Sequence, residues 1–72
     1  MMTIFYMKSN GKIKVCLTGE YDMAFFGDEQ EDYALIYGFI QVPEDGFIVR
    51  NLLEHQVIDG KVVFIREVIT NG

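Results

Sequence analysis

The chain alternates between apolar runs with a period of two and short polar segments rich in turn-forming residues. Residues 3–8 (TIFYMK) and 12–18 (KIKVCLT) are rich in β-branched and aromatic side chains, which favour strands. In the second run Lys12, Lys14 and Cys16 separate the apolar residues, so one face is expected to look inward. The segment between the runs contains Asn-Gly, the strongest short-range signal for a tight turn between strands. The pattern predicts a β-hairpin.

The connector that follows carries signals for short helical segments. Asp22 is placed to cap a single helical turn, and Gly27 to close it in the left-handed conformation. Asp28 and Glu31 then have the spacing of a capping box, with an acid at the cap and Glu three residues later. Carboxylates at this place also suit the dipole of a helix N-terminus.

Residues 29–38 fit two periods. Apolar residues from Tyr33 onward recur at i, i+3, i+4 and i+7, as in a helix, yet every second residue from Tyr33 to Phe39 is also apolar, as in a strand. Periodicity leaves both interpretations open. We expect a helix over about residues 29–37 that is broken at Gly38.

A second hairpin is expected in the middle of the chain. The apolar runs FIQV (residues 39–42) and FIVR (residues 47–50) flank the tetrapeptide PEDG. Pro43 presets φ for the first corner of a turn, and Gly46 can adopt the positive φ that such a loop demands.

The last third of the chain predicts a short turn and a third hairpin. Asn51 is placed to cap a turn through residues 52–54. The runs QVI (residues 56–58) and KVVFIREV (residues 61–68) flank Asp-Gly, which favours a tight turn. Residues 70–72 are expected to form a frayed tail.

These elements predict one small domain over residues 1–72, of the α+β class and dominated by β-structure. Three β-hairpins, at about residues 3–18, 38–50 and 55–68, are joined by short helical connectors. A chain of this length buries only about 60–65% of the surface that its unfolded form exposes, while half of its residues are apolar. Exposed apolar surface and unpaired strand edges favour self-association, so we expect a homo-oligomer.

Charge is distributed unevenly along the chain, whose formal net charge is −5. From Val15 to Val49 there is no Lys or Arg, and all carboxylates of this block are uncompensated within it. Two interpretations stay open: basic strands neutralise the acidic loops on the folded surface, or an acidic patch meets a basic partner. The negative net charge argues against direct binding of nucleic acid, whose backbone is also negative. The carboxylates of the block are Glu20, Asp22, Asp28, Glu29, Glu31, Asp32, Glu44 and Asp45.

Motifs for enzyme chemistry are missing from the sequence. Cys16 and His55 are the only thiol and the only imidazole, which gives no zinc-type cluster, and Cys16 has only Lys14 near it to lower its pKa. No glycine-rich phosphate loop and no EF-hand spacing occurs. We therefore expect a protein that is not an enzyme and has no metal or cofactor. Without an export signal or an apolar run of ~20 residues, it is expected in the cytoplasm, away from membranes.

The most distinctive stretch is GEYDMAFFGDEQEDY, residues 19–33, which interleaves aromatic and acidic residues and contains no base. Aromatic side chains surrounded by charge are typical anchors of protein interfaces. The alternative is a solvated connector whose aromatic residues cover the sheet. The candidate partner-binding residues are Glu20, Tyr21, Asp22, Phe25, Phe26, Asp28, Glu29, Glu31, Asp32 and Tyr33.

The layout of the whole chain resembles small uncharacterised phage and prophage proteins of Gram-positive bacteria. The similarity lies in NGKIKV near the start, FFG with an acidic run, DYALIYGFI, and a hairpin of the form xDGxV at the end. It implies a small accessory protein that acts through protein–protein contacts or self-association, in the cytoplasm of a bacterial host cell. An alternative function is an acidic inhibitor or mimic that occupies a basic, nucleic-acid-binding surface of a host protein.

Overall fold

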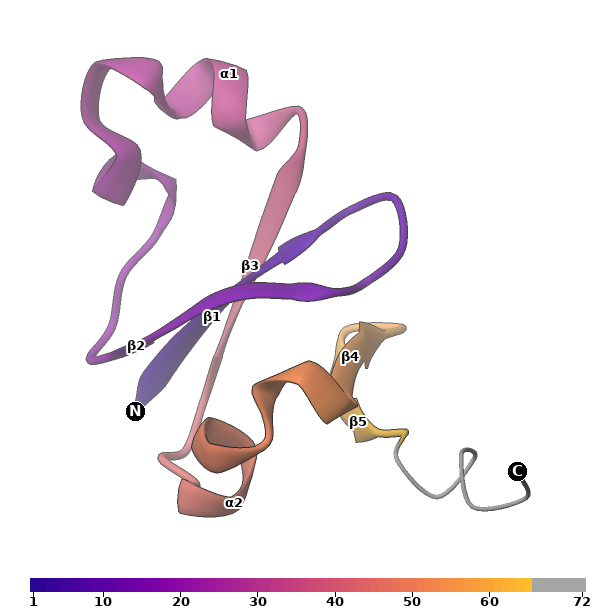
Figure 1. Cartoon of the computed structure of the whole chain (residues 1–72). Coiled ribbons are helices and arrows are strands. Elements are labelled where there is room, and N and C mark those ends of the chain that lie inside the picture. Colours follow the sequence, from indigo (N-terminus) through magenta and orange to yellow (C-terminus); the bar gives the residue numbers. More distant parts are fainter. Residues whose placement is uncertain (66–72) are drawn as a thin grey trace.

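The computed structural model describes residues 1–65 as a strand-rich α+β fold with two antiparallel sheets (Figure 1), as the sequence predicts. The last part of the expected third hairpin, residues 66–68, and the expected tail, residues 70–72, lie outside the described residues. The strands are β1 (Met2–Met7), β2 (Ile13–Thr18), β3 (Tyr37–Val42), β4 (His55–Ile58) and β5 (Lys61–Phe64); the helical segments are the 3₁₀ helices η1 (Met23–Glu29) and η2 (Leu52–Glu54) and the α-helices α1 (Gln30–Ala34) and α2 (Gly46–Arg50).

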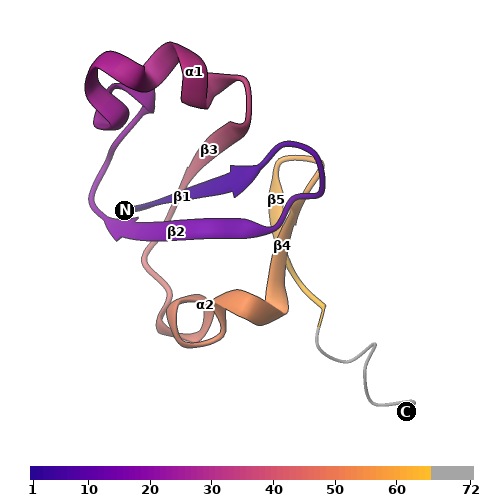
Figure 2. The ribbon, with the colours of Figure 1, turned by 45° about the horizontal axis from the view of Figure 1, so that its top comes forward.

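The predicted first hairpin is confirmed as β1 and β2. Its turn is closed by a hydrogen bond from the Lys12 backbone N–H to Asn10 Oδ1 (2.8 Å), and Gly11 adopts a φ of 78°. β1 also pairs with β3, so the larger sheet has the order β2-β1-β3 and β1 lies in its middle (Figure 2). As expected for a central strand, the first part of β1 is fully buried.

A β-bulge overturns the simple alternation expected for the second strand. Phe5 pairs with Val15, but Tyr6 pairs with Ile13, so Lys14 is an extra residue of β2. An extra residue shifts the faces by one position. Cys16 therefore points to the same side as Ile13, where both pack against the core.

The predicted central hairpin is wrong. β3 pairs with the free edge of β1, and residues 47–50 belong to the helix α2. Asp45 decides the local structure, because its Oδ1 accepts a hydrogen bond from the Phe47 backbone N–H (2.9 Å) and so caps α2. Gly46 is a helical residue without a positive φ. The three apolar residues 47–49 alone do not distinguish a strand from a helix.

The expected helix over residues 29–37 is present but shorter. α1 ends at Ala34, and Tyr37 and Gly38 already belong to β3, so Gly38 does not break the helix but lies within the strand. The aromatic, β-branched composition after Ala34 suits a strand, and β1 offers an open edge for it to pair with.

The connector signals are partly confirmed. Asp22 caps η1 through a hydrogen bond from the Ala24 backbone N–H to its Oδ1 (2.8 Å). Gly27 has a positive φ of 65°, but its ψ of −134° lies outside the expected left-handed helical conformation. The predicted capping box is wrong, because α1 begins after Glu29, whose side chain makes no capping hydrogen bond. The kink at Gly27 lies inside η1 and separates residues 23–26 from the residues that lead into α1.

The smaller sheet confirms the predicted hairpin around the Asp-Gly turn. Asp59 and Gly60 have φ of 52° and 76°, and β4 pairs with β5. This hairpin contacts the first one, because the Val57 backbone N–H donates to the Gly11 carbonyl (2.8 Å). Before it, η2 forms the expected short turn, although the Asn51 side chain donates to the Phe47 carbonyl instead of capping η2.

The larger sheet has a different cover on each face. On one face Met2 and Ile4 form a buried cluster with Val57 of β4, so the smaller sheet and α2 cover this side. On the other face Phe5, which is fully buried, lies under aromatic residues of η1. Figure 1 shows η1 and α1 at one end of the molecule and α2 at the other, with β3 running between them. Within residues 1–65 no helix has the length and apolar character needed to cross a membrane.

Candidate functional site

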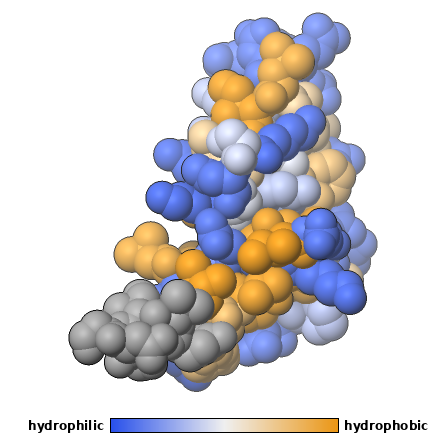
Figure 3. Space-filling model, turned by 90° about the vertical axis from the view of Figure 1, so that its right-hand side faces the viewer, coloured by the Kyte–Doolittle hydropathy of each residue, from blue (hydrophilic) through white to orange (hydrophobic). Residues whose placement is uncertain are grey.

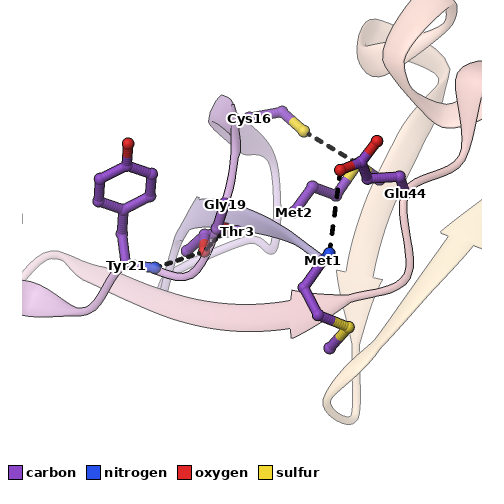
Figure 4. Close-up of polar contacts among 7 residues, drawn as sticks. All are labelled: Met1, Met2, Thr3, Cys16, Gly19, Tyr21 and Glu44. Atoms are coloured by element: carbon purple, nitrogen blue, oxygen red, sulfur yellow. Dashed lines mark hydrogen bonds and ion pairs between the residues drawn. The ribbon is translucent and has the colours of Figure 1, made fainter.

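The acidic, aromatic connector is attached to the sheet through Thr3. The hydroxyl of this buried residue donates to the Gly19 carbonyl (2.7 Å) and accepts from the Tyr21 backbone N–H (2.8 Å) (Figure 4). The Gln41 side-chain amide then donates to the Tyr21 carbonyl (2.8 Å). Residues 19–21 therefore cross the sheet from the end of β2, over β1, to β3.

Phe5 is the base on which the aromatic residues of the connector rest. Its ring lies 5.0 Å from Phe26 in an edge-to-face arrangement and 5.6 Å from Phe25 in a stacked one. Tyr33 and Tyr37 continue the cluster, with ring centroids 4.5 and 5.9 Å from Phe26. Such ring pairs contribute beyond the area that they bury. The connector therefore does cover the sheet, as one of the two interpretations proposed.

The same cluster also reaches solvent. Tyr21 is 41% and Phe25 is 48% exposed, and their rings form an edge-to-face pair at 5.5 Å. Phe26 and Tyr33 are only half-buried. The two interpretations are thus not exclusive, because the inner rings cover Phe5 while the outer rings form an exposed apolar surface.

The six candidate carboxylates are all exposed, and in residues 1–65 none of them forms an ion pair. Asp22 uses one oxygen as a helix cap. The ion pair found in the described part of the chain joins the Met1 amino group to Glu44 (3.9 Å) and lies elsewhere (Figure 4). Basic strands therefore do not neutralise the connector through direct contacts.

Two residues of β3 belong to this surface but were not predicted. Phe39 is 37% exposed and its ring lies 6.1 Å from Phe5, while Gln41 holds the Tyr21 carbonyl. The alternating apolar pattern up to Phe39 is the signal for these residues in the sequence, but the helical period over residues 29–37 competes with it. The ten predicted residues together with Phe39 and Gln41 are called the aromatic–acidic surface below.

The thiol and the imidazole are each engaged by other groups. Cys16 Sγ donates to Met2 Sδ (3.4 Å), and burial raises the pKa of the Cys16 thiol. A raised pKa leaves less of the nucleophilic thiolate at neutral pH. His55 is buried between the rings of Phe47 and Phe64, and its Nδ1 lies 2.7 Å from the Asn51 carbonyl oxygen. This geometry does not pair a nucleophile with a base.

In residues 1–65 no group of three or more His, Cys, Asp or Glu side chains is arranged to hold a metal ion. A cavity of about 200 Å³ lies between the two hairpins and η2, away from the aromatic–acidic surface. Its lining residues are Lys12, Ile13, Leu52, Leu53, His55, Gln56 and Ile65.

Comparisons with protein families, with curated proteins and with solved structures find no match to this chain.

Proposed function

We propose that this chain is a small non-enzymatic accessory protein that acts through protein–protein contacts at its aromatic–acidic surface. The observation that carries the proposal is the exposure of Tyr21 and Phe25, at 41% and 48%, although both are held in a cluster built on the buried Phe5. Aromatic side chains that are ordered before binding lose little entropy when a partner covers them. Such residues are efficient interface anchors.

A second candidate function is an acidic inhibitor or mimic that occupies a basic, nucleic-acid-binding surface of a host protein. It is favoured by the six exposed carboxylates, which have no ion-pair partner in residues 1–65. Unpaired surface carboxylates attract a basic partner and accelerate its association. The two functions differ in salt dependence, because a complex held by charge weakens with ionic strength much more than one held by apolar contacts.

The resemblance to phage and prophage proteins supports an accessory role in a bacterial host cell, and we place the protein in the cytoplasm of that cell.

Self-association is part of the same proposal. Apolar side chains (orange) gather in the lower part of Figure 3, at the end of the molecule that holds α2 and the smaller sheet. Leu53 at 95% and Val49 at 51% exposure belong to this end. A second copy of the chain would cover them.

Capture from host-cell extract tests the proposed contact surface. We expect the tagged full-length protein to retain a partner that the Phe25→Ser variant loses, because this change removes an exposed anchor. Leu53→Ser is the matched control, since it removes a more exposed apolar side chain at the opposite end. A partner retained equally by all three proteins would contradict the proposal. Repeating the capture at high salt separates the charge-driven alternative.

A further inference from the structure

We propose that the outer edge of β3 receives an extended, lysine- or arginine-rich segment of a partner protein, which adds to the larger sheet as a fourth strand. The inference rests on the proposed protein contact at the aromatic–acidic surface, which both candidate functions share, because it names the chemistry of the partner and its mode of docking there. Strand addition of this kind obtains affinity from main-chain hydrogen bonds and specificity from alternate side chains.

β3 presents unpaired backbone groups along one side. Lys8 donates its backbone N–H to the Ile36 carbonyl (2.8 Å), so Ile36 faces β1. Because successive residues of an antiparallel strand bond to opposite sides, Tyr37, Phe39 and Gln41 direct their N–H and C=O groups away from β1. In residues 1–65, β1 is the strand that β3 pairs with, and no further strand lies on its outer side.

The edge lacks the features that usually prevent strand addition. β3 has the sequence YGFIQV, with neither Lys nor Pro, and runs without a bulge against β1. Natural edge strands are commonly protected by lysine, proline or a bulge. Phe39 adds an aromatic ring that is 37% exposed, and an apolar or aromatic residue of an added strand would lie beside it.

The surroundings of the edge select a basic partner. The hydrogen bond from the Gln41 side chain to the Tyr21 carbonyl (2.8 Å) places the exposed Glu20 and Asp22 close to one end of the edge. At the other end, α1 leads into β3 and carries exposed Glu31 and Asp32. Basic side chains of an added strand would therefore meet carboxylates along the face that holds the aromatic cluster.

Two cations near the ends of β3 form no ion pair with these carboxylates in the described part of the chain. The Lys8 ammonium group donates to the Ala34 carbonyl (2.6 Å) at the C-terminal end of α1. The Arg50 guanidinium group belongs to α2, beyond the end of β3, and lies near Gly46. Four exposed carboxylates thus remain next to the edge without an ion-pair partner in the described part of the chain.

A second copy of the chain is a poor occupant of the same edge. Antiparallel pairing of two β3 strands about a two-fold axis brings α1 of each copy to the β3 end of the other. Glu31 and Asp32 of one copy would then approach Glu20 and Asp22 of the other, and like charges placed together oppose association. A basic segment gains from the same charges. We therefore assign this edge to a basic partner and not to self-association.

A synthetic peptide tests the proposal with the full-length protein. The probe is a blocked nine-residue peptide in which lysine alternates with valine and phenylalanine replaces the central lysine. When the peptide is extended, its lysine and phenylalanine side chains lie on one face and its valine side chains lie on the other. We expect binding that protects the backbone amides of Tyr37, Phe39 and Gln41 from hydrogen exchange, measured by NMR. We also expect the affinity to fall about tenfold or more between about 50 and about 500 mM salt.

Two N-methylated versions of the peptide test the backbone contacts. One carries a methyl group on the backbone nitrogen of every valine. The other carries it on the backbone nitrogen of every lysine and of the phenylalanine. Only alternate N–H groups of an added strand face the sheet, so one version should lose binding and the other should keep it. Which version fails also reports whether the added strand is parallel or antiparallel. Equal binding of both versions would overturn the proposal.

On the protein side, Gln41→Pro and Gln41→Ala form a matched pair. Both lose the hydrogen bond to Tyr21, but only proline removes the outward N–H. Proline is tolerated where an edge N–H faces solvent, so both variants should melt at similar temperatures. We expect Gln41→Pro to bind the peptide about tenfold or more weakly than Gln41→Ala. Equal affinities of the two variants for the peptide would overturn the proposal. A wild-type dimer that dissociates in Gln41→Pro but not in Gln41→Ala would also overturn it.

The capture experiment separates this docking mode from the proposed function. If Phe25→Ser loses the captured partner and Gln41→Pro retains it, the proposed function stands and strand addition at β3 is wrong.

Discussion

At the scale of single residues, Gly11 and Gly60 have nearly the same backbone conformation but different surroundings. Their φ angles are 78° and 76°, which disfavour side chains in both places. A Cβ on Gly11 would collide with the carbonyl oxygen of Val57, whereas nothing lies within 4 Å of a Cβ on Gly60. Two features therefore require glycine at position 11: the positive φ of the turn, and the close approach of the Val57 carbonyl where the two hairpins meet.

We expect Gly11→Ala to reduce the free energy of unfolding by about 2–3 kcal/mol, because backbone strain and a backbone collision add. Gly60→Ala, the control, carries only the strain and should cost about 1 kcal/mol. Urea titration of both variants measures the difference. Equal losses would mean that the hairpins do not meet at Gly11.

The Cys16 thiol should make stability depend on pH in alkaline solution. Burial raises the pKa of the Cys16 thiol above its ordinary value of 9.0 in the folded state. Above pH 9 the unfolded chain loses this proton first, so the folded state binds more protons and the free energy of unfolding falls as the pH rises. Below pH 9 both states are protonated and the effect disappears.

Comparing wild type with Cys16→Ala isolates this effect, since tyrosine and lysine titrate in both proteins. We expect the difference in the free energy of unfolding between the two to be constant below pH 8 and to shrink from pH 9 upward. Chemical denaturation at several pH values measures it. A difference that does not change with pH would show that Cys16 titrates alike in the folded and unfolded chain.

At the scale of elements, hairpins could be predicted where the turn itself carries the information. Asp59-Gly60 forms the expected tight turn, with a positive φ at both residues, and the expected hairpin forms around Asn10-Gly11, where Gly11 has the positive φ, because these backbone preferences act within a few residues. The middle of the chain differs, since Asp45 caps a helix and β3 pairs with a strand more than thirty residues earlier. Local patterns carry no information about such a distant edge.

Asp45 is therefore the residue that should decide the stability of α2. We expect Asp45→Ala to reduce the free energy of unfolding by about 1 kcal/mol, because the Phe47 backbone N–H loses its 2.9 Å partner. Asp45→Asn should keep most of the stability, since asparagine caps equally well. Thermal melting followed by circular dichroism compares the two. Equal melting of Asp45→Ala and wild type would argue against the helix.

At the scale of the whole molecule, the chemistry of the candidate surface could be predicted but its geometry could not. The aromatic and acidic composition of residues 19–33 is visible in the sequence. Which rings are covered depends on the buried Phe5 and on β3, which brings in Phe39 and Gln41. The position of β3 is a long-range property. The half-covered state of Tyr21 and Phe25 therefore becomes visible only in the structure.

Exposed apolar side chains at the other end of the molecule lead to a prediction about oligomeric state. Phe47, Val49 and Leu53, at 47, 51 and 95% exposure, belong to α2 and η2, whereas the six candidate carboxylates of the connector lie at the opposite end. Self-association through the α2 end buries apolar surface and keeps the acidic connectors of the two copies apart, which like-charge repulsion favours.

We therefore expect a homodimer in sedimentation experiments at micromolar concentration, formed at the α2 end. Leu53→Glu should dissociate it, because it places a charge in the apolar contact, and Phe25→Glu should leave it intact. Raising the salt concentration should not weaken the dimer, since charge contributes little to an apolar contact and screening reduces the repulsion between two negative copies. A monomeric wild type would show that these side chains stay exposed in the free protein, and a dimer lost only in Phe25→Glu would move the self-contact to the aromatic–acidic surface.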